Sequence, residues 1–113
     1  LNGGTSHVHL VAFGGPGGAM GSMAFHGTYV DVGGPVTCVT VRGADAWVAG
    51  EVAWGDGLGL DGWMARVVDH GSRDRAVTFL EEHALATAWC EAASTEHDAE
   101  YLQPVIEGWL RVR

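Results

Sequence analysis

The sequence feature that most constrains the fold is the run Val-Thr-Cys-Val-Thr-Val at residues 36–41, which is β-branched at nearly every position. Such residues fit the pleated surface of a sheet and are poor helix formers. Turn residues at 43–45 separate this run from a second strand pattern at 46–54, where alternate positions bring a tryptophan to each face. We therefore expect a β-rich protein with these two strands at the centre of its sheet, the second of them covered on both sides.

Further strand patterns flank this central pair, at residues 7–13, 22–30, 62–68, 76–80 and 105–112. The chain contains 18 glycines among 113 residues, which is typical of many tight turns between short strands. We expect glycine-rich loops at 14–21 and 55–61, a turn at 31–35 and a β-bulge at Gly27.

The stretch 81–100 differs from the rest because it is rich in alanine, and it predicts one short helix or an irregular segment. A chain of this length builds one hydrophobic core, so residues 1–113 are expected to form a single domain. The predicted fold class is all-β, as a single antiparallel sandwich or small barrel of about seven or eight strands.

The charge balance limits the partners of the chain. Six arginines stand against 14 acidic residues, and the formal net charge is −8. An acidic surface repels phosphate backbones and anionic lipids, so we expect no nucleic-acid partner. No run reaches the roughly 20 apolar residues of a membrane helix, so we expect no membrane insertion.

The two cysteines, Cys38 and Cys90, bear on the compartment. They either form a disulfide or remain two buried thiols of a cytosolic protein. The absence of Cys-x-x-Cys and of Cys/His zinc spacing favours the disulfide, which would stabilise the fold by about 4 kcal/mol. The sequence starts at Leu1 without a basic and apolar export signal, and we expect a secreted protein whose leader has been removed.

Histidines near the start of the chain form a candidate metal site. His7 and His9 are two positions apart, so both project from one face of a strand, and His26 on the next strand could supply a third nitrogen. The alternative is an exposed strand with solvated histidines, or histidines that remain from a tag. No other cofactor is expected.

Acid–base chemistry has weak candidates in Asp69, His70 and Asp74. A carboxylate that orients an imidazole could serve as a general base. Adjacent strand residues point apart, however, and the sequence Asp-His-Gly-Ser is equally typical of a turn whose carboxylate accepts backbone N–H groups.

Five tryptophans are many for this length, and Trp47, Trp54 and Trp63 are candidate ligand-binding residues. They could line a pocket for a small apolar or sugar-like ligand. They could equally be large core residues in a chain rich in glycine. Tryptophan beside glycine also leaves flat surface that suits a homo-oligomer formed through β edges or Trp-rich faces.

An ordered set of short motifs resembles small secreted actinobacterial β-rich domains of unknown function. The motifs are a Gly-x-x-x-Asp strand at 27–31, Val-Thr-Cys at 36–38, Val-Val-Asp-His-Gly at 67–71 with an Asp-Arg pair at 74–75, Cys90, and the end strand at 104–112. His70 stands where asparagine is usual, and Glu-Gly-Trp at 107–109 replaces Gly-Asn-Ile. The resemblance implies secretion and a Cys38–Cys90 bridge, and it brings no catalytic residues.

Two functions from different classes follow. The first is a secreted, disulfide-stabilised β-domain that acts by binding or self-association, with no catalysis evident. The second is a small β-barrel enzyme of the cyclase or isomerase type, whose aromatic-lined pocket would use His26, Asp69 or His70 for proton transfer. Metal binding through the three histidines is a third hypothesis. The sequence alone does not decide whether the protein is an enzyme.

Overall fold

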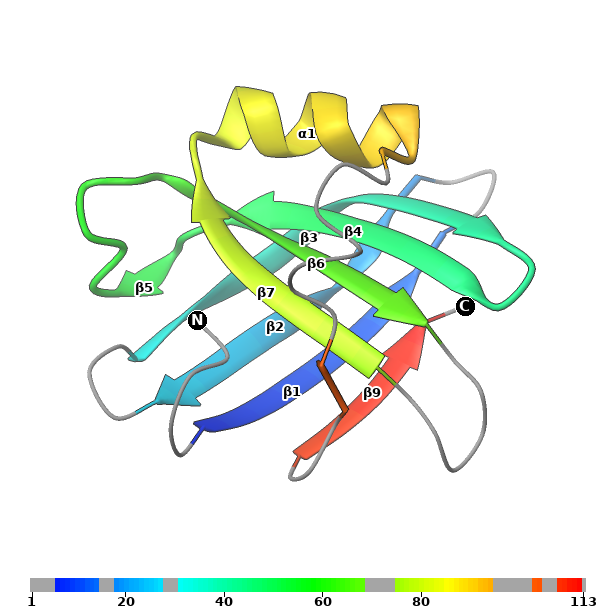
Figure 1. Cartoon of the computed structure of the whole chain (residues 1–113). Coiled ribbons are helices and arrows are strands. Elements are labelled where there is room, and N and C mark those ends of the chain that lie inside the picture. Colours follow the sequence, from blue (N-terminus) through cyan, green and yellow to red (C-terminus); the bar gives the residue numbers. More distant parts are fainter. Residues whose placement is uncertain are drawn as a thin grey trace.

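A computed structural model describes residues 6–14, 18–27, 31–68, 75–94, 103–104 and 108–112. These residues form one sheet and one helix, which confirms the predicted all-β class with a short helix within 81–100 (Figure 1). The elements are β1 Ser6–Phe13, β2 Met20–Gly27, β3 Asp31–Arg42, β4 Asp45–Glu51, β5 Trp54–Gly55, β6 Gly62–Val68, β7 Arg75–Glu81, α1 His83–Ala92, β8 Gln103–Pro104 and β9 Gly108–Val112.

The strands follow the order β8-β7-β6-β4-β3-β2-β1-β9, with β5 paired to the first part of β3. All pairs are antiparallel except β1 with β9. The sheet bends over, so that β6 and β7 cross in front of β1 and β2 (Figure 1). In the described part of the chain no ladder joins the two ends of this order, so the sheet is not closed into a barrel.

The concave side of the bent sheet holds the inner core. Alternate residues of β1, β2, β3, β4 and β6 point into it. Six of its large side chains are at most 2% exposed: Leu10, Met23, Phe25, Val32, Val48 and Trp63. The burial of these apolar side chains on both halves of the sheet provides most of the driving force for folding.

A second core lies on the convex side, where α1 packs across β3, β4 and β6 (Figure 1). It consists of Cys38, Trp47, Ala49, Met64, Ala86, Trp89, Cys90 and Ala93. Strand β4 is therefore covered on both faces. The cover predicted for 46–54 holds for residues 46–50, which are all buried, whereas Trp54, the tryptophan expected on the other face, is 44% exposed on β5. The helix ends at Ala92, and its C-cap residue Ala93 has a φ of 49° and donates its N–H to Cys90 O.

A register shift within β3 reverses the faces of the sheet to which its later side chains point. Val36 pairs with Gly50 and Cys38 pairs with Ala49, so Thr37 is the extra residue of a β-bulge. The predicted bulge at Gly27 was wrong, because Gly27 pairs with Ser6 in a regular ladder. Before the bulge the even positions of β3 face the inner core, and after it they face α1.

The predicted turn at 31–35 was also wrong, since these residues begin β3. At Gly33 and Gly34, atoms of neighbouring strands come so close to the backbone that a side chain would not fit. A Cβ at Gly34 would stand 1.9 Å from Glu51 O, and a Cβ at Gly33 would stand 2.4 Å from Met23 O. Pro35 pairs with Ser22 within the ladder. The strand expected at 46–54 is interrupted as well, because β4 ends at Glu51 and β5 begins at Trp54.

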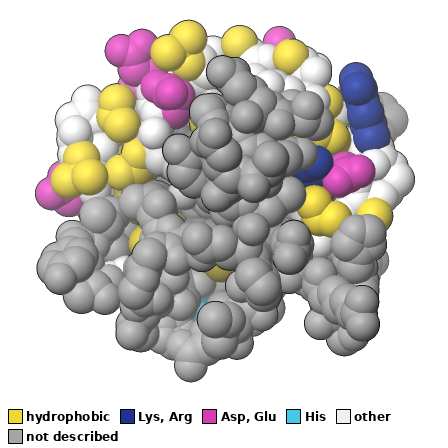
Figure 2. All heavy atoms as spheres, viewed as in Figure 1, with side chains coloured by type: hydrophobic (Ala, Val, Ile, Leu, Met, Phe, Trp, Pro, Cys, Tyr) yellow, Lys and Arg dark blue, Asp and Glu magenta, His cyan; other side chains and the backbone are white. Residues whose placement is uncertain are grey.

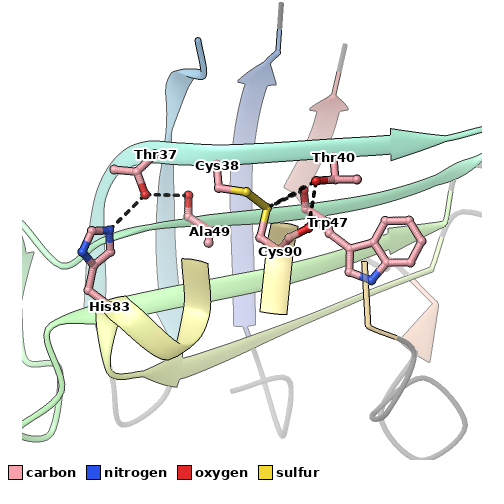
Figure 3. The surroundings of a disulfide bond; sticks show 7 residues. All are labelled: Thr37, Cys38, Thr40, Trp47, Ala49, His83 and Cys90. Carbon is pink, nitrogen blue, oxygen red and sulfur yellow. Dashed lines mark hydrogen bonds between the residues drawn. A yellow bond between two sulfur atoms is a disulfide. The ribbon is translucent and has the colours of Figure 1, made fainter. Parts of the chain in front are cut away.

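The Cys38–Cys90 disulfide joins the centre of the sheet to α1 over a sequence separation of 52 (Figure 3). Both cysteines are buried, and Thr40 Oγ1 donates to Cys90 O over 2.8 Å. Cys90 Sγ also lies 3.3 Å from Trp47 O, a contact without a hydrogen bond because a disulfide sulfur carries no hydrogen. The predicted pairing is thus confirmed. Within the described ranges, no helix has the length and apolarity that crossing a membrane requires.

Candidate functional site

The most exposed tryptophan among the three predicted ligand-binding residues is Trp54, on the short strand β5. It pairs with Gly33, and its ring lies over the Gly33 backbone: a Cβ there would stand 2.4 Å from Trp54 Cζ2. The missing side chain of Gly33 therefore provides the space for the indole. Trp54 remains 44% exposed. One side of the ring is supported by the sheet, and much of the rest is accessible to solvent.

Two polar side chains lie beside this ring. His26 on β2 pairs in register with Asp31 on β3, and His26 Nδ1 lies 3.2 Å from Asp31 Oδ1. The His26 and Trp54 ring centroids are 5.8 Å apart, with an interplanar angle of 29°. We call Trp54, His26, Asp31 and Gly33 together the Trp54 face.

The chemistry of the Trp54 face follows from these groups. The Asp31 carboxylate is an acceptor with more lone pairs than its bond to His26 uses. The His26 bond engages Nδ1, and Nε2 takes no part in it. The indole offers an apolar ring surface. The face can therefore hold a ring that is apolar on one side and carries hydrogen-bonding groups at its rim.

The other two candidate tryptophans lie in the two cores. Trp63 is 0% exposed in the inner core, where it lies against Gly50 and donates from Nε1 to Glu51 O over 3.0 Å. Trp47 is 4% exposed beneath α1, and its Nε1 donates to Ser94 O over 2.7 Å. The Arg66 guanidinium lies 4.0 Å from the Trp47 ring centroid. The structure thus distributes the three predicted residues over three separate environments.

The three histidines of the predicted metal site lie on paired strands. His7 is the register partner of His26, and His9 is the register partner of Ala24. The His7 side chain lies outside the part of the structure whose side chains are described. No group of three potential ligands occurs among the described side chains. Metal binding at these histidines stays a prediction.

Among the predicted acid–base residues, the structure describes His26 alone. Asp69, His70 and Asp74 lie outside the described residues. His26 lies on the convex side of β2, two positions from Ala24, whereas its neighbour Phe25 points into the inner core.

A cluster at the start of α1 was missed by the sequence analysis (Figure 3). His83 Nε2 lies 3.1 Å from Thr37 Oγ1, and His83 Nδ1 lies 4.0 Å from Glu51 Oε1. The backbone N–H of His83 donates to Asp61 Oδ1 over 2.8 Å. No sequence signal could have revealed this cluster, because the bulge at Thr37 brings together residues that are distant in the chain.

The cluster has the order of a hydroxyl, an imidazole and a carboxylate, as in nucleophilic enzymes. The His83–Glu51 separation is longer than a hydrogen bond, however, and Thr37 Oγ1 also lies 3.4 Å from Ala49 O. A main-chain acceptor therefore competes with His83 for the hydroxyl proton. The geometry fits a structural role, in which the start of α1 is tied to β3 and to the loop before β6.

Comparisons of the chain with protein-family models, with curated proteins and with solved structures found no significant match.

Proposed function

We propose that this protein is a secreted binding module that holds a ring-shaped ligand on the Trp54 face and catalyses no reaction. The observation that carries the proposal is the Trp54 indole, which is exposed and yet seated on the sheet over Gly33. An exposed aromatic ring in a fixed position offers a large contact area at low cost in conformational entropy.

The polar neighbours of the ring support the same function. His26 and Asp31 extend from adjacent positions of two paired strands, and they are bonded to each other. Side chains on strands are held more precisely than side chains on loops. A ligand that contacts both residues and Trp54 therefore meets a surface that needs little rearrangement, which favours affinity.

Secretion is supported by the disulfide. Disulfides persist in oxidising compartments and are rare in the reducing cytosol. The Cys38–Cys90 bridge links the sheet to α1, so it is a structural part of the fold.

The placement of His26 favours binding over the enzyme alternative. An isomerase-type barrel would need acid–base groups directed into an aromatic-lined interior. His26 lies on the convex side, while Trp63, Phe25 and Leu10 fill the inner core. These placements support a function at the outer surface of the sheet.

The proposal is tested with the variant Trp54→Ala. Leu85→Ala is the matched control, because Leu85 is an exposed apolar residue of α1. Isothermal titration measures the binding of two kinds of soluble ring compound, neutral oligosaccharides and 2-naphthol. We expect at least one of them to bind the wild-type protein and Leu85→Ala equally, and Trp54→Ala about tenfold more weakly.

Sedimentation velocity of the same three proteins tests self-association. A monomer at all concentrations supports a ligand-binding face. A dimer that Trp54→Ala dissociates would contradict the proposal, since a second copy would then occupy the face. Wild-type protein that binds neither kind of compound would contradict it as well.

A further inference from the structure

We infer that the ligand of the Trp54 face is a neutral carbohydrate, whose pyranose ring stacks on Trp54 and whose hydroxyl groups bond to Asp31 and His26. The inference rests on the proposed function and narrows the ligand to one chemical class. Three features of the protein support it: the exposed indole, the polar side chains next to it and the acidic net charge.

The openness of the ring separates sugars from flat aromatic ligands. Trp54 lies against the Gly33 backbone on one side and is 44% exposed. Sites for apolar ligands normally enclose most of the ligand surface. A flat aromatic molecule on Trp54 would keep its second face in water. A pyranose suits a one-sided platform, because its axial C–H groups form one apolar face while its hydroxyl groups remain hydrated or bonded.

The rim of the face carries the groups that sugar hydroxyls require. The Asp31 side chain is 66% exposed. Its carboxylate can accept hydrogen bonds from two sugar hydroxyl groups and still retain its hydrogen bond with His26. The His26 side chain is 52% exposed, and its ring is 5.8 Å from the Trp54 ring. A sugar on the exposed part of the indole would therefore find an imidazole stacked with the indole and a charge-assisted acceptor bonded to that imidazole.

Charge selects neutral sugars over acidic ones. The formal net charge is −8, and the exposed Asp31 carboxylate is bonded to His26, whose ring is stacked with Trp54. Uronic acids and sugar phosphates would be repelled by both the local carboxylate and the overall field. Among the side chains that Figure 2 draws in colour, acidic ones are spread over the upper half of this view and the basic ones lie toward its right edge.

The size of the platform also predicts the strength of binding. One stacked ring with two polar contacts is a small interface, and most of its interaction energy offsets the lost freedom of the ligand. We therefore expect Kd values of about 1 mM for a short oligosaccharide. Retention on an insoluble polysaccharide should be stronger, because neighbouring sugar rings rebind before the protein diffuses away.

Isothermal titration tests the inference with soluble hexasaccharides of β-1,4-glucose, β-1,4-N-acetylglucosamine and β-1,4-mannose, and pull-down tests it with the corresponding insoluble polymers. Polygalacturonate serves as the acidic probe and 2-naphthol as the aromatic probe. The proteins are wild type, Trp54→Ala, Asp31→Ala, Asp31→Asn and the control Leu85→Ala. Urea unfolding first establishes that each variant folds.

We expect at least one neutral sugar to bind wild type and Leu85→Ala alike, and Trp54→Ala about tenfold more weakly. Asp31→Ala should weaken binding about fivefold, and Asp31→Asn less, because an amide still accepts one hydroxyl. Polygalacturonate should not bind.

The alternative outcomes separate the two proposals. If 2-naphthol binds in a Trp54-dependent way and no neutral sugar does, the carbohydrate inference is overturned while the binding function stands. Tighter binding of polygalacturonate than of any neutral sugar also overturns the inference. If no probe binds the wild-type protein, both proposals fall.

Discussion

Two tryptophans of this protein owe their positions to glycines on neighbouring strands. Trp63 lies over Gly50 on the inner side of the sheet, and Trp54 lies over Gly33 on the outer side. A Cβ at either glycine would stand 2.4 Å from the nearest ring atom. The glycines within these strands therefore provide room for large rings, and the same kind of contact builds the core at one site and an exposed platform at the other.

At the residue scale we predict the effect of Gly33→Ala. The new Cβ would collide with the Trp54 ring and with Met23 O, so stability should fall by about 1–3 kcal/mol in urea unfolding. In a Trp54→Ala background the same substitution should cost less, because only the backbone contact remains. Equal costs in both backgrounds would show that the ring does not lie over Gly33.

At the scale of elements, the bulge at Thr37 decides what β3 contributes to each face. Val36 belongs to the inner core, whereas Cys38 belongs to the core beneath α1. In a regular strand, residues two positions apart share a face. The extra residue reverses this alternation, so Cys38 reaches Cys90 and Thr37 reaches His83.

Deletion of Thr37 should therefore remove the bulge and leave the disulfide in place. Without the extra residue, Cys38 follows Val36 directly, and adjacent residues of a regular strand point to opposite faces, so Val36 stays in the inner core and Cys38 still faces Cys90. We expect no free thiols by mass spectrometry after alkylation without reductant, together with a loss of about 1 kcal/mol of stability, because the Thr37 contacts with His83 and Ala49 disappear. Deletion of Gly59 in the exposed loop before β6 is the control, and it should also leave the disulfide intact. Free thiols in the Thr37 deletion would refute the role assigned to the bulge.

At the scale of the whole molecule, the disulfide holds α1 on the sheet. The helix has 10 residues, and its N-cap residue Glu82 makes no side-chain cap bond. An isolated helix of this length is marginal in water, so α1 depends on tertiary contacts. Those contacts are the bridge, the packing of Trp89 and Ala86, and the Asp61 bond to the His83 N–H.

Replacement of both cysteines, Cys38→Ser with Cys90→Ser, should lower the free energy of unfolding by about 4 kcal/mol, because the bridge closes a long loop in the unfolded chain. Amide exchange should rise more over residues 83–92 than over β1 and β2, since the helix loses its covalent link while the inner core is untouched. Wild-type protein in the same buffer is the reference. Equal loss of protection in helix and sheet would contradict this account.

Most of the strands could be predicted from the sequence, as could the place of the one described helix within 81–100, and the cysteine pattern favoured a Cys38–Cys90 bridge. β-branched runs, glycine-bounded segments and an alanine-rich stretch are local signals, and local signals report secondary structure well. Alternation also predicted cover on both sides for 46–54, which holds for 46–50 alone.

Which residues lie on each face of the sheet depends on contacts between segments that are distant in the sequence. The glycines at 33 and 34 are typical of a turn in the sequence. In the structure they belong to an extended strand, where they contact β5 and β4 closely. The three predicted ligand-binding tryptophans are divided between two cores and one exposed face, because each position depends on a neighbour distant in sequence. A single extra residue, Thr37, reverses the faces to which the later side chains of β3 point. The sequence pattern within the strand does not indicate such a shift.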